Sequence, residues 1–269
     1  MDVGTRDYAG GKMLAATQGG VGLVTFNQPE KRNAMSIEMW QGLGEILDGF
    51  AADPAVRVVV LTGAGNKAFV SGADISQFEK NRSNADAQVE YDRLTSAGRA
   101  KLSGFAKPTI AMIRGFCLGG GLAIAMQADL RIAGESAQFG IPAARLSIAY
   151  AFDGLRKLVQ LVGPAHARMI LYTANRLPAR EAERIGLINQ AVDDAALEET
   201  VMGIARTIAE NAPLSIAASK LTITEVMKDP ADRNMEAVRV AGAACFDSAD
   251  YKEGRTAFMA KRRPVFTGQ

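Results

Sequence analysis

Two glycine-containing turns are the segments of this chain whose residue types and spacing could do chemistry. The first is AFVSGADI at 68–75, and the second is GFCLGGGLA at 115–123. Each lies between an apolar run typical of a strand and a segment typical of a helix. Backbone N–H groups at the start of a helix lack intrahelical partners and can hold an anion. Two such donors meeting at one oxygen would form an oxyanion hole, which stabilises an enolate or a tetrahedral intermediate. Each turn alone is equally compatible with an ordinary tight turn.

The length and composition limit the classes of protein to which the chain can belong. At 269 residues and 48% hydrophobic, it can bury the core of one large domain or of a domain with a subdomain. The net charge of +2 gives no sign of a nucleic-acid partner. Cys117 and Cys245 lie in apolar segments without the spacing of metal ligands, so no metal site is expected. With no signal-like or membrane-spanning apolar run, the sequence predicts a cytoplasmic protein without membrane contact.

The segments around the two turns alternate between strand-like and helix-like patterns. Residues 12–26 predict a β-hairpin, because two apolar runs flank the turn QGG. Ser36 is a good N-cap for a helix over 37–52. Further strands are predicted at 56–62, 109–114 and 129–133, and helices at 86–105 and 118–128. This alternation is typical of an α/β fold built from repeated crossovers.

The pattern becomes almost entirely helical near residue 193. Residues 195–260 predict three or four amphipathic helices that form an appended subdomain, with prolines between them. The last of these helices carries Tyr251, Phe258 and Met259. Such apolar side chains either pack within the subdomain or form a subunit interface.

Several segments, in order, resemble the enoyl-CoA hydratase/isomerase (crotonase) superfamily, and the resemblance covers nearly the whole chain. They are PEKRNAM at 29–35, FVSGADI at 69–75, GFCLGGG at 115–121, ADLRIA at 128–133, AQFG at 137–140 and the stretch 247–264. The resemblance implies a crotonase-type α/β fold with a core of repeated ββα turns forming a superhelix. It implies a core with the acyl-CoA site over 1–193 and a helical trimerisation subdomain over 194–269.

The same resemblance implies the ligand and the groups that hold it. The substrate would be an acyl-CoA thioester, with no separate cofactor because coenzyme A is part of the substrate. The N–H groups of Ala73 and Gly120 would hold the thioester oxygen, and the chain would assemble as a homotrimer or as a hexamer of two trimers. The substrate- or CoA-binding residues would be Lys31, Arg32, Ala34, Ser71, Gly72, Asp74, Ile75, Gly119 and Lys261. Lys and Arg suit phosphate groups, although charged loops are usually just solvated.

The chain departs from the hydratases of that superfamily at two positions. Those hydratases carry two glutamates where this chain has Ala123 and Ala143. Hydration needs a group that deprotonates the water and a proton source for the α-carbon, and alanine can be neither. The resemblance therefore supports the thioester site but argues against hydration by the usual pair.

Asp153 and Tyr150 are the titratable residues of the segment 146–155 that could replace the missing carboxylates. Asp153 is either a catalytic base or an N-cap of a helix that begins at Gly154. Tyr150 lies where methylmalonyl-CoA decarboxylases of the superfamily look similar, although the known decarboxylase has a histidine at the position of Ala73. Decarboxylation needs little beyond an oxyanion hole and an apolar pocket.

The sequence thus predicts a crotonase-family enzyme that stabilises a thioester enolate, with isomerisation or decarboxylation favoured over simple hydration. The alternative is a catalytically reduced acyl-CoA-binding protein. A role in RNA binding has no support, because the chain lacks a helix face dense in Lys and Arg. His166, the one histidine of the chain, is expected at the surface.

Overall fold

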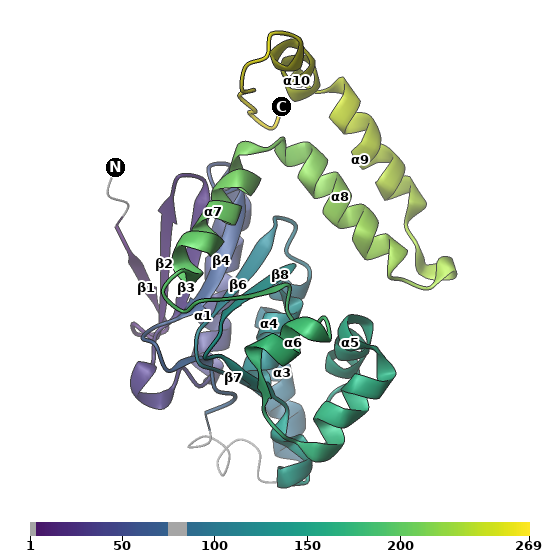
Figure 1. Cartoon of the computed structure of the whole chain (residues 1–269). Helices are drawn as coiled ribbons and strands as arrows, with labels where there is room; N and C mark the ends of the chain where they lie inside the picture. Colours follow the sequence, from purple (N-terminus) through teal and green to yellow (C-terminus); the bar gives the residue numbers. More distant parts are fainter. Residues whose placement is uncertain (1–3, 75–84) are drawn as a thin grey trace.

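The computed structural model describes residues 4–74 and 85–269, and its core contains two β-sheets (Figure 1). The larger, seven-stranded sheet has the order β1-β2-β3-β4-β6-β8-β11 and the smaller, four-stranded sheet the order β10-β9-β7-β5. The strands of the larger sheet are β1 (Arg6–Tyr8), β2 (Met13–Gln18), β3 (Val21–Phe26), β4 (Val58–Gly63), β6 (Thr109–Ile113), β8 (Leu130–Gly134) and β11 (Gln190–Val192). Those of the smaller sheet are β5 (Ala68–Val70), β7 (Phe116–Leu118), β9 (Gln138–Gly140) and β10 (Leu177–Pro178).

Helices follow the strands and then fill the C-terminal part of the chain. They are α1 (Ile37–Ala52), α3 (Ala85–Ser103), α4 (Gly120–Gln127), α5 (Phe152–Thr173), α6 (Ala179–Arg184), α7 (Leu197–Glu210), α8 (Pro213–Val226), α9 (Met235–Asp247) and α10 (Ala249–Met259). Short 3₁₀ turns are η1 (Pro29–Lys31), η3 (Pro142–Leu146) and η4 (Pro230–Asp232). In the part of the chain that the structure describes, no helix has the length and apolar character of a membrane span.

The core repeats the unit strand, strand, helix. The successive units are β4–β5–α3, β6–β7–α4 and β8–β9–α5. The first strand of each unit joins the larger sheet and the second joins the smaller sheet, and both sets pair in parallel. The predicted α/β fold with repeated ββα turns is therefore confirmed. Because β5 and β7 are neighbours, the segments that follow them also lie close together.

The central strands are buried on both faces, as parallel sheets usually are. In β4, Val59 and Leu61 belong to the apolar cluster that also contains α1. Val58 and Val60 belong to the cluster on the opposite face, which α7 covers. The larger sheet is thus sandwiched between helices, and its continuous apolar sequence is explained by the alternation of its side chains between two cores.

The hairpin and α1 form where the sequence predicts them. Gln18 pairs with Val21, and Gly19 and Gly20 have positive φ, as a two-residue hairpin turn requires. The helix α1 begins after Ser36, whose side chain accepts a hydrogen bond from the Met39 N–H at 3.3 Å. The helix predicted over 118–128 begins later, at Gly120, because residues 116–118 form β7 in the smaller sheet.

The C-terminal helices fall into two groups. Leu197, Val201 and Ala205 of α7 are fully buried against the larger sheet, so α7 is part of the core. The helices α8, α9 and α10 extend away from the sheets (Figure 1). The predicted boundary after residue 193 precedes α7, and the assignment of a separate trimerisation subdomain stays a prediction.

The side chains of Lys220 and Arg57 make polar contacts that attach this extension to the core. The Lys220 ammonium group donates to the Lys107 carbonyl at 2.9 Å and lies 2.7 Å from an Asp129 carboxylate oxygen. The Arg57 guanidinium donates to the carbonyl oxygens of Ala209 and Phe266. These contacts fix the middle of α8, the end of α7 and the C-terminal tail relative to the larger sheet.

Candidate active site

The ends of β5 and β7 bring the two glycine-containing turns together. Strand β5 leads to Gly72 and Ala73, and β7 leads to Gly119 and then into α4 at Gly120. A Cβ atom placed on Gly120 would lie 3.7 Å from the Ala73 nitrogen, so the two backbone segments are in contact. The structure thus brings together the two residues that were predicted to hold a thioester oxygen.

The Ala73 and Gly120 N–H groups are not used by the backbone hydrogen bonds described around them. The parallel bridge between Met35 and Ala73 uses the Gly72 carbonyl and the Asp74 N–H, at 2.8 and 2.9 Å, and leaves the Ala73 N–H out. Gly120 is the first residue of α4, and the first helical bond runs from the Ala123 N–H to the Gly119 carbonyl at 3.0 Å. Neither the Ala73 nor the Gly120 N–H donates to an acceptor within residues 4–74 and 85–269. Donors without an acceptor of their own are one condition for an oxyanion hole.

Two glycines make the close approach of these segments possible. Gly119 has φ 51° and ψ −114°, a conformation that side-chain-bearing residues rarely adopt, and it turns the chain from β7 into α4. A Cβ atom at Gly121 would lie 1.9 Å from the Val70 carbonyl oxygen, so only glycine fits between α4 and β5. The glycine pattern of the sequence therefore reflects contact between the two turns.

The loop 27–36 packs beside the first turn and is fixed by a buried asparagine. The Asn33 side-chain amide donates to the carbonyl oxygens of Ala64 and Ala68 at 3.0 and 2.8 Å. Its side-chain oxygen accepts from the Gln28 N–H at 2.9 Å, and the residue is fully buried. Sequence reasoning did not identify this role. The available signal was an asparagine, a residue that tolerates left-handed backbone, within a short polar loop.

Lys31 connects this loop to the residue after Ala73. Its ammonium nitrogen lies 2.9 Å from a carboxylate oxygen of Asp74, which is buried while Lys31 is half-exposed. The hydrogen bond and the charge of Asp74 raise the pKa of Lys31 above its ordinary value. The structure thus places Lys31 and Asp74, both predicted as binding residues, beside Ala73.

Arg32 lies on the same loop but makes a different contact. Its guanidinium carbon lies 5.3 Å from the centre of the Phe116 ring, and that of Arg176 lies 4.8 Å from it. Phe116 is the first residue of β7, so these cations gather near the strand that leads to Gly119. The sequence prediction included Arg32 but missed Arg176, because their shared contact with Phe116 depends on the fold.

The remaining predicted binding residues do not all lie near the two turns. Ala34 is buried, and the Ser71 N–H donates to the Arg32 carbonyl at 3.1 Å, so both lie with the loop 27–36 and the first turn. Ile75 lies outside the described residues. Lys261 follows α10, at the opposite end of the molecule from β7 (Figure 1). Within one chain the structure therefore does not bring Lys261 to the other site residues.

Tyr150 and Asp153 differ in their surroundings. Tyr150 packs against the main core cluster, and its hydroxyl oxygen lies 3.5 Å from the Gly119 carbonyl oxygen. Burial raises the pKa of the Tyr150 phenol above its ordinary value. Asp153 is exposed. Tyr150 is partly buried, and a phenol that keeps its proton at neutral pH is a donor and not a base.

The interpretation of Asp153 as an N-cap is wrong. The helix α5 begins at Phe152 instead of Gly154, its N-cap residue is Ala151, and no side chain caps it. Asp153 therefore lies inside the first turn, where its charge is favourable near the positive end of the helix dipole. His166 is exposed on the same helix, as predicted.

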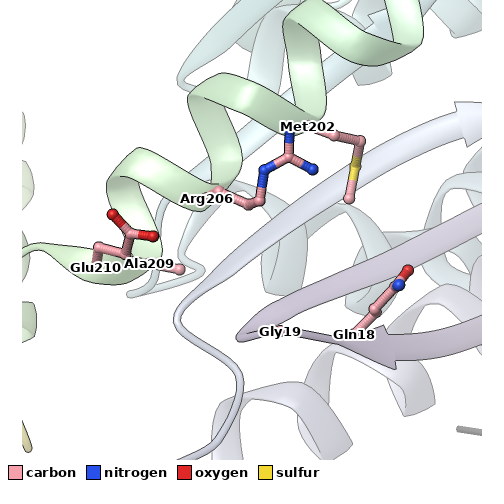
Figure 2. Close-up of a pocket in the computed structure, with 6 residues that line it drawn as sticks. All are labelled: Gln18, Gly19, Met202, Arg206, Ala209 and Glu210. Atoms are coloured by element: carbon pink, nitrogen blue, oxygen red, sulfur yellow. The ribbon is translucent and has the colours of Figure 1, made fainter. Parts of the chain in front are cut away.

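Two cavities have neither Ala73 nor Gly120 among their lining residues. One of about 350 Å³ lies between the β2–β3 hairpin and α7, where Met202 and Arg206 face Gln18 and Gly19 (Figure 2). It contains none of the predicted site residues. Another of about 280 Å³ lies beside the loop 27–36 and includes Arg32, Glu30 and Lys67 among its lining residues.

The fold, with its repeated strand–strand–helix units and two sheets, defines the class of protein as crotonase-type. The enoyl-CoA hydratase/isomerase family model matches residues 16–269, and the chain belongs to this family. It is 37% identical over 251 residues to the short-chain-enoyl-CoA hydratase of Clostridium acetobutylicum, covering 93% of this chain and 95% of that protein. It is 39% identical over 241 residues to the crotonyl-CoA hydratase of Syntrophomonas wolfei, covering 90% and 92%.

A solved structure agrees with this assignment. The structure of an enoyl-CoA hydratase/carnithine racemase from Magnetospirillum magneticum superposes with a TM-score of 0.92 at 36% identity, covering 96% of each chain. Sequence and structure therefore both show the family and its fold. Membership of this enzyme family implies an acyl-CoA thioester substrate.

Proposed function

We propose that this protein binds an acyl-CoA thioester and stabilises its enolate between the N–H groups of Ala73 and Gly120. The observation that carries the proposal is the contact between two turns that each offer a backbone donor without a described acceptor. The electron pair moves onto the thioester oxygen when Asp153, the remaining candidate base, takes the α-proton, or when a carboxylate on the α-carbon leaves as CO₂. Two fixed donors at that oxygen lower the energy of the charge as it develops.

Within this chemistry we favour isomerisation or decarboxylation over simple hydration. Ala123 lies about one turn after Gly120 on α4, so both residues are on the same face of this helix, next to the proposed oxyanion hole. Ala143 lies in η3 and packs on the main core. Neither can deprotonate water, and hydration needs that step. Decarboxylation needs only loss of CO₂ from the substrate and delivery of one proton to the α-carbon.

Hydration is the second candidate, and the names of the relatives favour it. Two relatives with more than a third of their residues identical are a short-chain-enoyl-CoA hydratase and a crotonyl-CoA hydratase. A catalytically reduced acyl-CoA-binding protein is the alternative from another class. These functions differ in what they do to a bound thioester, so one set of substrates separates them.

The deciding experiment follows α-proton exchange of butyryl-CoA in deuterated water by NMR, together with the hydration of crotonyl-CoA. We expect exchange with weak or no hydration, and turnover of an unsaturated or an α-carboxylated acyl-CoA. Hydration at ordinary hydratase rates would contradict the preference for isomerisation or decarboxylation. Tight acyl-CoA binding without exchange or turnover would support the catalytically reduced protein.

A gain of function provides a matched test of the missing carboxylates. Glutamates introduced together as Ala123→Glu and Ala143→Glu should raise crotonyl-CoA hydration, since positioned acid–base groups typically contribute about 10²–10⁴-fold. The single variants are the controls, because each supplies only one member of the pair. Equal rates in the double variant and the original chain would mean that these positions do not face the substrate.

We further propose a homotrimer or a hexamer of two trimers. Large apolar side chains, among them Phe246, Phe258 and Met259, are exposed on α9 and α10 within one chain. Closed symmetric assembly would cover such residues. In that assembly Lys261 would serve the site of a neighbouring copy, because it lies far from β7 of its own chain. Light scattering that shows only a monomer of about 28.5 kDa would contradict this proposal.

A further inference from the structure

The ring of Tyr150 packs directly on Gly154 at the start of α5, where the absence of a side chain leaves room for it. A Cβ atom placed on Gly154 would lie 2.6 Å from one carbon of the Tyr150 ring, and its next ring contacts would be 3.3 and 3.4 Å. Any side chain at position 154 would therefore displace the ring. Tyr150, which is partly buried, also packs against the main core cluster. The location of the phenol is thus set by packing and not by solvent.

The Tyr150 hydroxyl reaches a carbonyl that is already part of the candidate site. Its oxygen lies 3.5 Å from the Gly119 carbonyl oxygen, which also accepts from the Ala123 N–H at 3.0 Å. A carbonyl oxygen has two lone pairs and can accept both donors. The Gly119 carbonyl belongs to the same peptide group as the Gly120 N–H, so a donor on its oxygen acts on that N–H.

We propose that Tyr150 is a positioning residue for the oxyanion hole, donating to the Gly119 carbonyl and so orienting and polarising the peptide whose N–H belongs to Gly120. Hydrogen bonds in a chain strengthen one another, so a donor at the oxygen end of a peptide makes its N–H a stronger donor. This inference rests on the proposed function of the Gly120 N–H. It gives Tyr150 a role without proton transfer to the substrate.

The chemistry of the surrounding groups agrees with this role. Burial raises the pKa of the phenol, so it remains protonated and able to donate throughout the neutral range. The neighbouring Cys117 thiol is fully buried, and burial raises its pKa as well. Neither group is therefore an anion that would compete for the Tyr150 hydroxyl proton.

The test removes the hydroxyl while keeping the ring, in the variant Tyr150→Phe. The readout is the thioester carbonyl stretch of bound butyryl-CoA, ¹³C-labelled at the carbonyl, by infrared difference spectroscopy. In the original chain, the stretch should shift to lower frequency on binding. In Tyr150→Phe we expect a smaller shift and a rate of α-proton exchange at saturating substrate that falls about 2- to 12-fold, the range of one net hydrogen bond. The KM should not change.

A matched control and a second probe accompany this variant. Tyr172→Phe removes a hydroxyl from an exposed residue near the end of α5 and should change neither the shift nor the rate. Gly154→Ala should reduce the carbonyl shift by displacing the Tyr150 ring. Gly242→Ala, at a helical glycine with open space, is its control. The double variant Tyr150→Phe/Gly154→Ala should lose little more than the larger single effect.

The outcomes separate the inference from the function on which it rests. No carbonyl shift in the original chain would contradict the oxyanion hole itself. A normal shift in the original chain that is unchanged in Tyr150→Phe would overturn only the role of Tyr150. A change in KM with an unchanged shift would also overturn it, because it would mean that Tyr150 contacts the substrate. Thermal unfolding of each variant shows whether the fold is kept.

Discussion

Lys31 and Asp74 form an ion pair of 2.9 Å that joins the loop 27–36 to the residue immediately after Ala73. Asp74 is buried and Lys31 is half-exposed, so the pair lies where the first turn meets solvent. The Asp74 N–H also donates to the Met35 carbonyl at 2.9 Å. Backbone and side chain of Asp74 thus both hold the segment that carries the Ala73 N–H.

The stability that this pair contributes should depend on pH in a defined way. The pKa of Lys31 is raised in the folded state, so its contribution is fully present below the unfolded value of about 10.4. It is lost as the pH rises through the higher folded value. We therefore expect the stability difference between the original chain and Lys31→Gln to be constant from pH 6 to 9 and to decrease above about pH 10.4.

Urea unfolding of both proteins across this range measures the difference directly. Lys12→Gln is the control, because the pair of Lys12 with Glu38 is longer, at 3.7 Å, and both partners are substantially exposed. A difference for Lys31→Gln that already disappears between pH 7 and 9 would contradict the raised pKa.

A proline at position 120 should remove one donor of the proposed oxyanion hole. Gly120 is the first residue of α4, a position where proline is well tolerated because its N–H has no helical partner. Gly120→Pro should lower the rate of α-proton exchange by about 10²–10³-fold. Gly120→Ala keeps the N–H, and its Cβ lies at an ordinary contact distance of 3.7 Å from the Ala73 nitrogen. Equal losses in both variants would indicate a steric effect and not a lost donor.

Truncation of Leu197 tests the assignment of α7 to the core. Its side chain is fully buried in the cluster between α7 and the larger sheet. Leu197→Ala should lower the free energy of unfolding by about 2–5 kcal/mol, from lost apolar burial and the remaining cavity. Glu199→Ala, on the exposed side of the same helix, should change it by less than about 0.5 kcal/mol. Chemical denaturation gives both values, and a loss below about 1 kcal/mol for Leu197→Ala would mean that α7 detaches easily.

Glu253 should hold the C-terminal tail on α10 in a pH-dependent manner. The Arg262 guanidinium donates to its carboxylate at 2.6 and 2.8 Å, and the Val265 N–H donates at 2.9 Å. These contacts lower the pKa of Glu253 to about 2. A lowered pKa means that the contribution is present above the unfolded value of about 4.3 and is lost as the pH falls through the folded value.

Hydrogen exchange of the Val265 amide measures this contact. We expect Glu253→Gln to speed exchange at pH 6, and the original chain to keep its protection until the pH falls below about 4. Glu236→Gln is the control, because Glu236 pairs with Arg239 within α9 and does not contact the tail. Unchanged exchange at Val265 in Glu253→Gln would show that other contacts fix the tail.

The elements that could be predicted from the sequence are those with strong local signals. The hairpin turn at Gly19 and Gly20 and the cap at Ser36 are set by residues close in sequence, and the structure confirms both. The strands of the smaller sheet span three residues or fewer, so they show no periodicity. Their formation depends on neighbours from other units, which is why Leu118, the last residue of β7, was assigned to the following helix.

The same distinction applies to the candidate site. The contact between Ala73 and Gly120 follows from two glycine patterns together with the family resemblance, and the structure brings the two residues together. The role of Asn33 and the packing of Tyr150 on Gly154 depend on tertiary contacts that no local pattern contains. The N-cap alternative for Asp153 was wrong because the helix begins earlier than Gly154 indicated.

The space at Gly121 also bears on how this chain can diverge over time. A methyl group there would lie 1.9 Å from the Val70 carbonyl, so even the smallest substitution would push α4 away from β5. Ala123, only two positions further on, is half-buried and bears no such restriction in its backbone. Among natural variants we expect position 121 to be always glycine, while the residue at position 123 varies. A lineage can then acquire a new reaction by exchanging side chains around a backbone that it never has to rebuild.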